Sequence, residues 1–278
     1  MFYGYEKFYV NGTSYTEGGG LEEPEKVGSK GSVYRFYKEI YNTPRWYSRS
    51  EVNYGTRLSE ELGIPCINEA KSGGSCERMV RMTYNFLWEN WDKRHKLFLI
   101  LENPDGSRGE VYYKGNKSHY IVNSIMDDEG KNQIFSYATR EYYNKETEKE
   151  DYELQPFFKE WYKNHFGIRE NWLKSEMAFV GLYSFCKMNG IRIFVMNANN
   201  MIFRDSFNWE DVIKFGNDEK NYDISSWAHD NQHTIKDETN GLSSDGHCGY
   251  YGNIEYAKLL KEFLIKKFTN KEQTKKMI

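Results

Sequence analysis

Short apolar runs alternate with longer amphipathic segments along much of the chain. Two of the runs, Lys96–Leu101 and Ile191–Met196, are apolar at nearly every position, which is typical of strands buried on both faces of a parallel sheet. Two shorter runs precede them. The pattern therefore predicts four strands, at Lys7–Val10, Ile64–Ile67, Lys96–Leu101 and Ile191–Met196.

The segments between these strands have helical periodicity and recognisable ends. Gly63 and Asn189-Gly190 are typical of helix C-termini, and Ser75 is a typical N-cap. The predicted helices are Ser50–Leu62, Cys76–Asn90, 170–189 and Gly249–Phe268, the last with Ile254, Ala257, Leu260, Leu264 and Phe268 on one face. Strands that alternate with helices predict an α/β sandwich around a mostly parallel sheet, whose active site lies at the carboxyl ends of the strands.

Two segments depart from this alternation. Residues 18–49 are polar and rich in Gly and Tyr, and we expect a long loop there. Residues 104–168 mix Tyr, Asn, Lys and Glu, and we expect an insertion with helical patches that forms a cap over the site. The remaining framework is long enough for one large core, so we expect a single domain over residues 1–278.

Composition narrows the function classes. The net charge of -3 gives no indication that the chain binds nucleic acid or an anionic membrane. No stretch approaches the roughly 20 apolar residues of a membrane-spanning helix. The N-terminus lacks the pattern of a signal peptide, so we expect a cytoplasmic protein. The four cysteines form no C-x-x-C pair, and we expect reduced thiols. Aromatic residues make up 17% of the chain, which suits either a ring-rich core or stacking on flat ligands such as sugars.

Side chains with catalytic chemistry follow the predicted strands. Ser14 follows Gly12 just beyond the first strand, where a nucleophile would be exposed beside backbone N–H groups. Gly73 follows the second strand, and a glycine there can turn its N–H toward an oxyanion. Asn103 follows the third strand and can donate its side-chain amide to the same oxyanion. Each feature alone is also compatible with an ordinary turn.

A fourth feature precedes the last helix. The segment Ser243-Ser244-Asp245-Gly246-His247-Cys248-Gly249 places a carboxylate two residues before a histidine in a predicted loop. A histidine in such a setting can act as general base with the carboxylate orienting it. Asp230 and Asp237 are alternative partners for His247.

The order of these features resembles the signature blocks of SGNH (GDSL-like) hydrolases, including phage- and bacterial-type members. The phrase NEAKSGGSCERM is similar to the second block, and DGHCGYYGNIEYAKLLKEF is similar to the terminal block. The resemblance covers about half of the chain and implies a three-layer α/β/α sandwich with a flavodoxin-like sheet. It also implies a serine esterase without a cofactor, with Ser14 as nucleophile, Asp245 and His247 as its partners, and Gly73 and Asn103 in the oxyanion hole. The implied substrate is a small-molecule or carbohydrate ester, such as an O-acetylated sugar.

The chain differs from the family pattern at four points. Thr13 stands where the family has Asp, the Asp-x-His spacing is shorter than Asp-x-x-His, and Cys248 stands where Pro is usual. The third block also lacks Gly-x-Asn-Asp, so Arg108 and Glu110 are alternative residues that hold substrate or brace the loop. Two other functions remain open: a non-catalytic SGNH-like module with a degraded site, and a metal site at His229 and His233, which are spaced i and i+4.

Overall fold

Four parallel strands form the central sheet. They are β1 (Lys7–Asn11), β2 (Cys66–Asn68), β3 (Leu97–Asn103) and β7 (Arg192–Asn197), in the order β2-β1-β3-β7, and every pairing between neighbours is parallel. All four predicted strands are therefore confirmed, and β3 has a neighbour on both sides, as its continuous apolar run predicts. The computed structural model describes residues 2–17, 53–71, 73–103, 107–126, 133–141, 148–197, 211–213, 234–236, 243–248 and 250–276, with Ile224, Trp227, Ala228 and Asn231.

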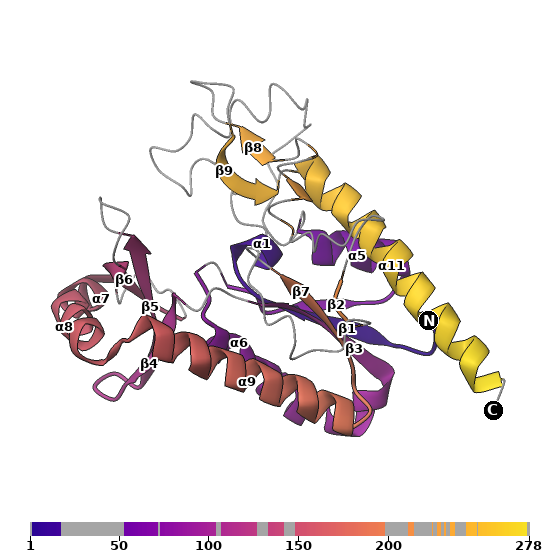
Figure 1. Ribbon diagram of the computed structural model, residues 1–278, viewed down its shortest axis with the longest axis horizontal. Coiled ribbons are helices and arrows are strands. Elements are labelled where there is room, and N and C mark those ends of the chain that lie inside the picture. The colour runs from indigo at the N-terminus through magenta and orange to yellow at the C-terminus, as the bar shows by residue number, and fades with distance from the viewer. Residues whose placement is uncertain are drawn as a thin grey trace.

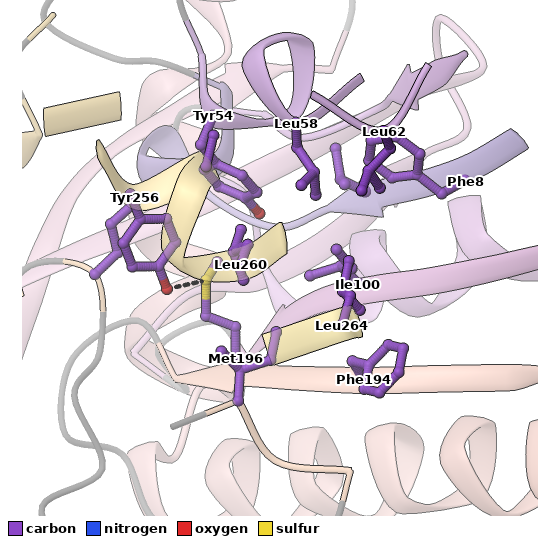
Figure 2. Packing of buried hydrophobic residues seen from close by; sticks show 14 of the residues in the cluster. Phe8, Tyr54, Leu58, Leu62, Ile100, Phe194, Met196, Tyr256, Leu260 and Leu264 are labelled. Atoms are coloured by element: carbon purple, nitrogen blue, oxygen red, sulfur yellow. Dashed lines mark hydrogen bonds between the residues drawn. The ribbon is translucent and has the colours of Figure 1, made fainter. Parts of the chain in front are cut away.

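One face of the sheet packs against α5 (Tyr54–Leu62) and α11 (Tyr250–Lys276). Successive side chains of a strand point to opposite faces, so alternate residues of each strand meet these helices. Figure 2 shows this core from close by, with the Tyr256 hydroxyl donating to Met196 Sδ at 2.8 Å. The residues labelled there are Phe8, Ile100, Phe194 and Met196 of the sheet, and Tyr54, Leu58, Leu62, Tyr256, Leu260 and Leu264 of the two helices.

The other face packs against α6 (Cys76–Glu89) and α9 (Ile168–Met188). The ring of Tyr9 stacks on Phe86 of α6, with their centroids 4.2 Å apart. Leu99 and Ile193 contribute from the sheet to the same core, which Phe179 and Leu182 complete from α9. Helices thus cover both faces, with α9 and α11 on opposite sides of the sheet (Figure 1).

The helix ends follow the local chemistry that the sequence indicates. Ser75 accepts a hydrogen bond from the Arg78 N–H at 3.2 Å, and Gly63 adopts the left-handed conformation at the end of α5. Asn53 caps α5 by accepting from the Thr56 N–H at 2.9 Å, so that helix begins at Tyr54 and not at Ser50. The last helix runs to Lys276, eight residues beyond the predicted end, because its sequence contains no Gly or Pro after Phe268.

Residues 104–168 contain a second sheet, which the sequence reading missed. Strands β4 (Gly109–Tyr113), β5 (Ser118–Met126) and β6 (Gln133–Arg140) pair antiparallel in that order. Among the described residues of this segment, α7 (Glu148–Glu153) and α8 (Gln155–His165) match the expected helical patches. This segment lies to one side of the parallel sheet (Figure 1). It has a small core of its own, made by Tyr120, Val122, Ala138, Phe158 and Tyr162.

A third pairing corrects the prediction of a loop before the last helix. Residues Ser243–Cys248 form strand β9, which pairs antiparallel with β8 (Thr234–Lys236) with Ile235 opposite Asp245. A short helix, α1 (Ser14–Glu17), follows β1, and a 3-10 helix, η2 (Trp91–Lys96), precedes β3. The predicted loop at 18–49 lies outside the described residues. Within the described chain, no helix has both the length and the apolar character to span a membrane.

Candidate functional site

The turns that follow β1 and β2 meet at the carboxyl edge of the parallel sheet. The N–H of Lys71 donates to the carbonyl of Gly12 at 3.2 Å. A Cβ on Gly74 would lie 2.8 Å from the Lys71 carbonyl oxygen and 3.1 Å from that of Gly12, so only glycine allows this approach. Ser14 begins α1 two residues beyond Gly12, and the two turns that carry Ser14 and Gly73 are therefore brought together.

A buried carboxylate from β3 holds the first of these turns. Glu102 is fully buried and accepts hydrogen bonds from the N–H of Thr13 at 3.0 Å and of Thr16 at 3.1 Å. The hydroxyls of the same two threonines also donate to it. Burial raises the pKa of Glu102, while these four donors oppose that shift. Where the SGNH pattern has an acidic residue beside the serine, this chain has Thr13 bound to a carboxylate from the neighbouring strand.

The first turn of α1 is fixed by two further elements. The hydroxyl of Tyr54, in α5, lies 3.0 Å from Thr16 Oγ1. The side-chain amide of Asn68, at the end of β2, donates to the Thr16 carbonyl at 2.8 Å. The backbone that carries Ser14 is thus held from three sides, by α5, β2 and β3, which is the rigid support that a nucleophile requires.

Gly73 lies beside a residue of the second sheet. It has a left-handed φ of 74°, and a Cβ there would lie 3.4 Å from Asn123 Oδ1 and 3.8 Å from Asn123 Nδ2. Asn123 is buried in β5 at a shift in the β5–β6 register. Its amide donates to the Ile121 carbonyl at a long 3.4 Å. The sequence reading missed Asn123, because nothing in the sequence shows that β5 reaches the turn after β2.

The strand with the Asp-Gly-His segment lies near the candidate nucleophile. Backbone positions of β9 lie within 8 Å of those of α1, Cα to Cα. Asn103 is the last residue of β3, at the same edge of the sheet, and is in register with Asn197 of β7. The structure describes the backbone of Ser14, Asn103, Asp245 and His247, and their side chains lie outside the described set. Asp230 and Asp237 are also outside it.

Glu110 was predicted either to hold substrate or to brace a loop, and its contacts with Arg81 favour the second role. The Arg81 guanidinium donates to both carboxylate oxygens of Glu110, at 2.7 and 3.1 Å, and to Glu141 at 2.8 Å. Arg78 lies 3.0 Å from Glu141 and donates to the Glu69 carbonyl at 2.9 Å. Two arginines of α6 therefore tie the second sheet to the exit of β2, and Glu110 braces this junction.

The described residues also bear on two other chemistries. His229 and His233 lie outside it, and the described residues contain no group of three potential metal ligands. Cys66, Cys76 and Cys186 form no disulfide, and burial raises the pKa of each thiol, which disfavours the reactive thiolate. Many aromatic rings lie in the core, which accounts for part of their abundance.

Comparison with protein-family models gave no match for this chain, and neither did a search of curated proteins.

Proposed function

We propose that the chain is a serine hydrolase of the SGNH type that cleaves esters with Ser14 as nucleophile. The observation that supports this most directly is the meeting of the turns after β1 and β2 through the Lys71–Gly12 hydrogen bond, with β9 beside α1. These are the three places where the proposed mechanism needs a nucleophile, an oxyanion donor and a base.

The architecture supports the same proposal. The strand order β2-β1-β3-β7, with helices on both faces, is the arrangement expected of a three-layer α/β/α sandwich with a flavodoxin-like sheet. In this proposal residues 1–278 form one domain, and the second sheet within 104–168 is the cap-like insertion. A Cβ at Gly73 would lie 3.4 Å from Asn123 Oδ1, so that insertion reaches the edge of the proposed site.

The proposed reaction is acyl transfer in two steps. His247, oriented by Asp245, removes the proton of Ser14 as the serine oxygen attacks the ester carbonyl, and the alcohol leaves with the proton from His247. Water, activated by the same histidine, then hydrolyses the acyl-enzyme. The N–H groups of Ser14 and Gly73 and the amide of Asn103 hold the oxyanion, and we add Asn123 as a further amide donor because it lies against Gly73.

For the substrate we propose an O-acetyl ester of a carbohydrate. Tyr112 of β4 and Tyr137 of β6 are about half exposed, at 49% and 50%. Exposed tyrosine rings on a sheet next to the site are suited to stacking on sugar rings.

A fluorophosphonate probe tests the nucleophile, because it reacts covalently with activated serines. The folded wild type should gain the mass of one probe, and Ser14→Ala should gain none. Ser118→Ala is the matched control, since Ser118 lies in the second sheet and donates to the Asn116 carbonyl; it should be labelled like the wild type. A folded wild type that remains unlabelled and fails to hydrolyse p-nitrophenyl acetate would overturn the proposal and favour a non-catalytic module.

A further inference from the structure

A cavity separate from the Ser14 turn lies between α6, β4, α8 and α9. Its volume is about 240 Å³. The titratable residues that line it are Glu77, Glu110, Glu170, Lys174 and His165, and Trp161 and Phe166 supply aromatic surface. For scale, an apolar cavity of about 150 Å³ in another protein holds benzene. A ligand of one ring with a short polar arm therefore fits this volume.

The carboxyl group of Glu77 interacts with Ser75 and Lys174, but one of its oxygens lacks a hydrogen-bond partner within the described residues. Its Oε2 atom is buried and accepts no hydrogen bond within the described part of the chain. Burial raises the pKa of Glu77, because the charged form loses its water. A buried acceptor without a partner destabilises the protein, so the group is poised to gain from a ligand that donates to it.

The other charges of the cavity leave it favourable to a cation. The Glu110 carboxylate is already paired with Arg81, at 2.7 Å. Glu77 and Glu170 then line the cavity together with one lysine, Lys174, so two acidic side chains accompany one ammonium group. An anionic ligand would meet repulsion here, whereas a cation would balance the excess negative charge.

The aromatic wall is shaped by a glycine. A Cβ at Gly109 would lie 3.0 Å from Phe166 Cε2, so glycine lets the Phe166 ring lie directly against the β4 backbone. Trp161 and Phe166 contact each other with their centroids 6.3 Å apart. Indole faces attract both flat rings and cations.

We propose that this cavity binds a small primary amine that carries one ring, with the ammonium group donating to Glu77 and the ring against Trp161. The proposal is independent of the proposed esterase. Such amines come from two chemical sources, aromatic amines and amino sugars, and both share the ammonium group and the ring.

Isothermal titration of the full-length chain with 2-phenylethylamine and with glucosamine tests the proposal. Their neutral counterparts, 2-phenylethanol and glucose, are the controls for the ammonium group. At least one amine should bind at least tenfold more tightly than its counterpart, and the one that binds identifies the source. Failure of both amines to bind, or equal binding of amine and counterpart, would overturn the proposal.

Glu77→Gln keeps the shape of the side chain but removes its charge, and should weaken amine binding at least tenfold. Glu89→Gln is the matched control, because Glu89 is an exposed carboxylate at the other end of α6, and should bind like the wild type. Thermal unfolding confirms that each variant is folded. Trp161→Leu supplies a second measure. It should also lower the affinity for the amine, and any change in tryptophan fluorescence that the amine causes in the wild type should be lost. Unchanged affinity in folded Glu77→Gln would contradict the assignment.

Discussion

The carboxylate of Glu102, in β3, accepts a hydrogen bond from the N–H of Thr13, in the turn after β1, at 3.0 Å. The two residues are 89 positions apart in the chain, and the bond fixes the backbone immediately before Ser14. It also requires Gly12, since a Cβ at that position would collide with the Cβ and the carboxylate of Glu102.

Gly12→Ala should lower the free energy of unfolding by about 1–3 kcal/mol, because the added methyl overpacks a site already filled by Glu102. Gly181→Ala is the matched control. Gly181 lies within α9 with open space around its Cα, so alanine there should raise stability by about 0.5–1 kcal/mol through helix propensity. Urea unfolding of both variants measures the difference. Equal stability of Gly12→Ala and the wild type would contradict the close packing.

Glu102→Gln should change how stability depends on pH. The pKa of Glu102 in the folded protein lies above its ordinary value of 4.5, so between these two pKa values the folded state binds more protons than the unfolded state. The contribution of Glu102 to stability is therefore complete below about pH 4.5 and is lost as the pH rises through the raised pKa. The variant cannot titrate at this position. The wild type should lose stability relative to Glu102→Gln across that window, as urea unfolding from pH 4 to pH 8 would show; a difference that is constant with pH would refute the shift.

Arg81→Met should destabilise the junction between α6 and the second sheet. It leaves Glu110 without its main partner, while Glu141 keeps Arg78. Removing one member of a buried pair costs about 3–5 kcal/mol, but the Arg81 side chain is 27% exposed, so we expect a smaller loss of about 1–3 kcal/mol. Lys258→Met breaks an exposed pair with Glu255 and should cost much less in the same measurement, because solvent screens that pair. If both variants lose the same free energy of unfolding, the Arg81 junction stabilises the protein no more than an exposed ion pair does.

Asn123→Ala tests the added oxyanion donor and depends on the proposed function. If Asn123 donates to the oxyanion, its loss should lower kcat about 10²- to 10³-fold and leave KM nearly unchanged. Hydrolysis of p-nitrophenyl acetate provides the readout. Asn85→Ala, on the exposed side of α6, should keep the wild-type kcat. If the variant raises KM but keeps the wild-type kcat, Asn123 does not stabilise the oxyanion.

The parallel framework was predictable because its signals are local. The continuous apolar run at Lys96–Leu101 requires burial on both faces. Ser75 begins one helix and Gly63 ends another, each through contacts within one turn. The antiparallel strand Ser118–Met126 gave no such signal. Its apolar residues are interrupted by polar ones, and its strand conformation depends on pairing with β4 and β6.

In the candidate site, too, local features could be predicted from the sequence and contacts between distant segments could not. Ser14 and Gly73 could be proposed from their positions after predicted strands, and the structure brings their turns together. Glu102 stood next to Asn103 in the sequence, but its partners Thr13 and Thr16 come from a distant turn, so no local pattern indicates its role. For Asp245 and His247, strand pairing with β8 replaced the loop that their polar, glycine-containing sequence predicts.

The packing of α11 on the parallel sheet has a consequence for the order of folding. Phe268 contacts Phe2, with ring centroids 5.5 Å apart, and the Tyr3 hydroxyl lies 2.9 Å from Thr269 Oγ1. The core on this face therefore joins residues more than 260 positions apart, and contacts of such separation form slowly because a long loop must close first. During synthesis, α5 can already pack on this face, but Phe8 and Ile100 lack the cover that α11 supplies until that helix has been made. We expect this apolar face to be partly exposed for that interval, and such exposed surface favours aggregation.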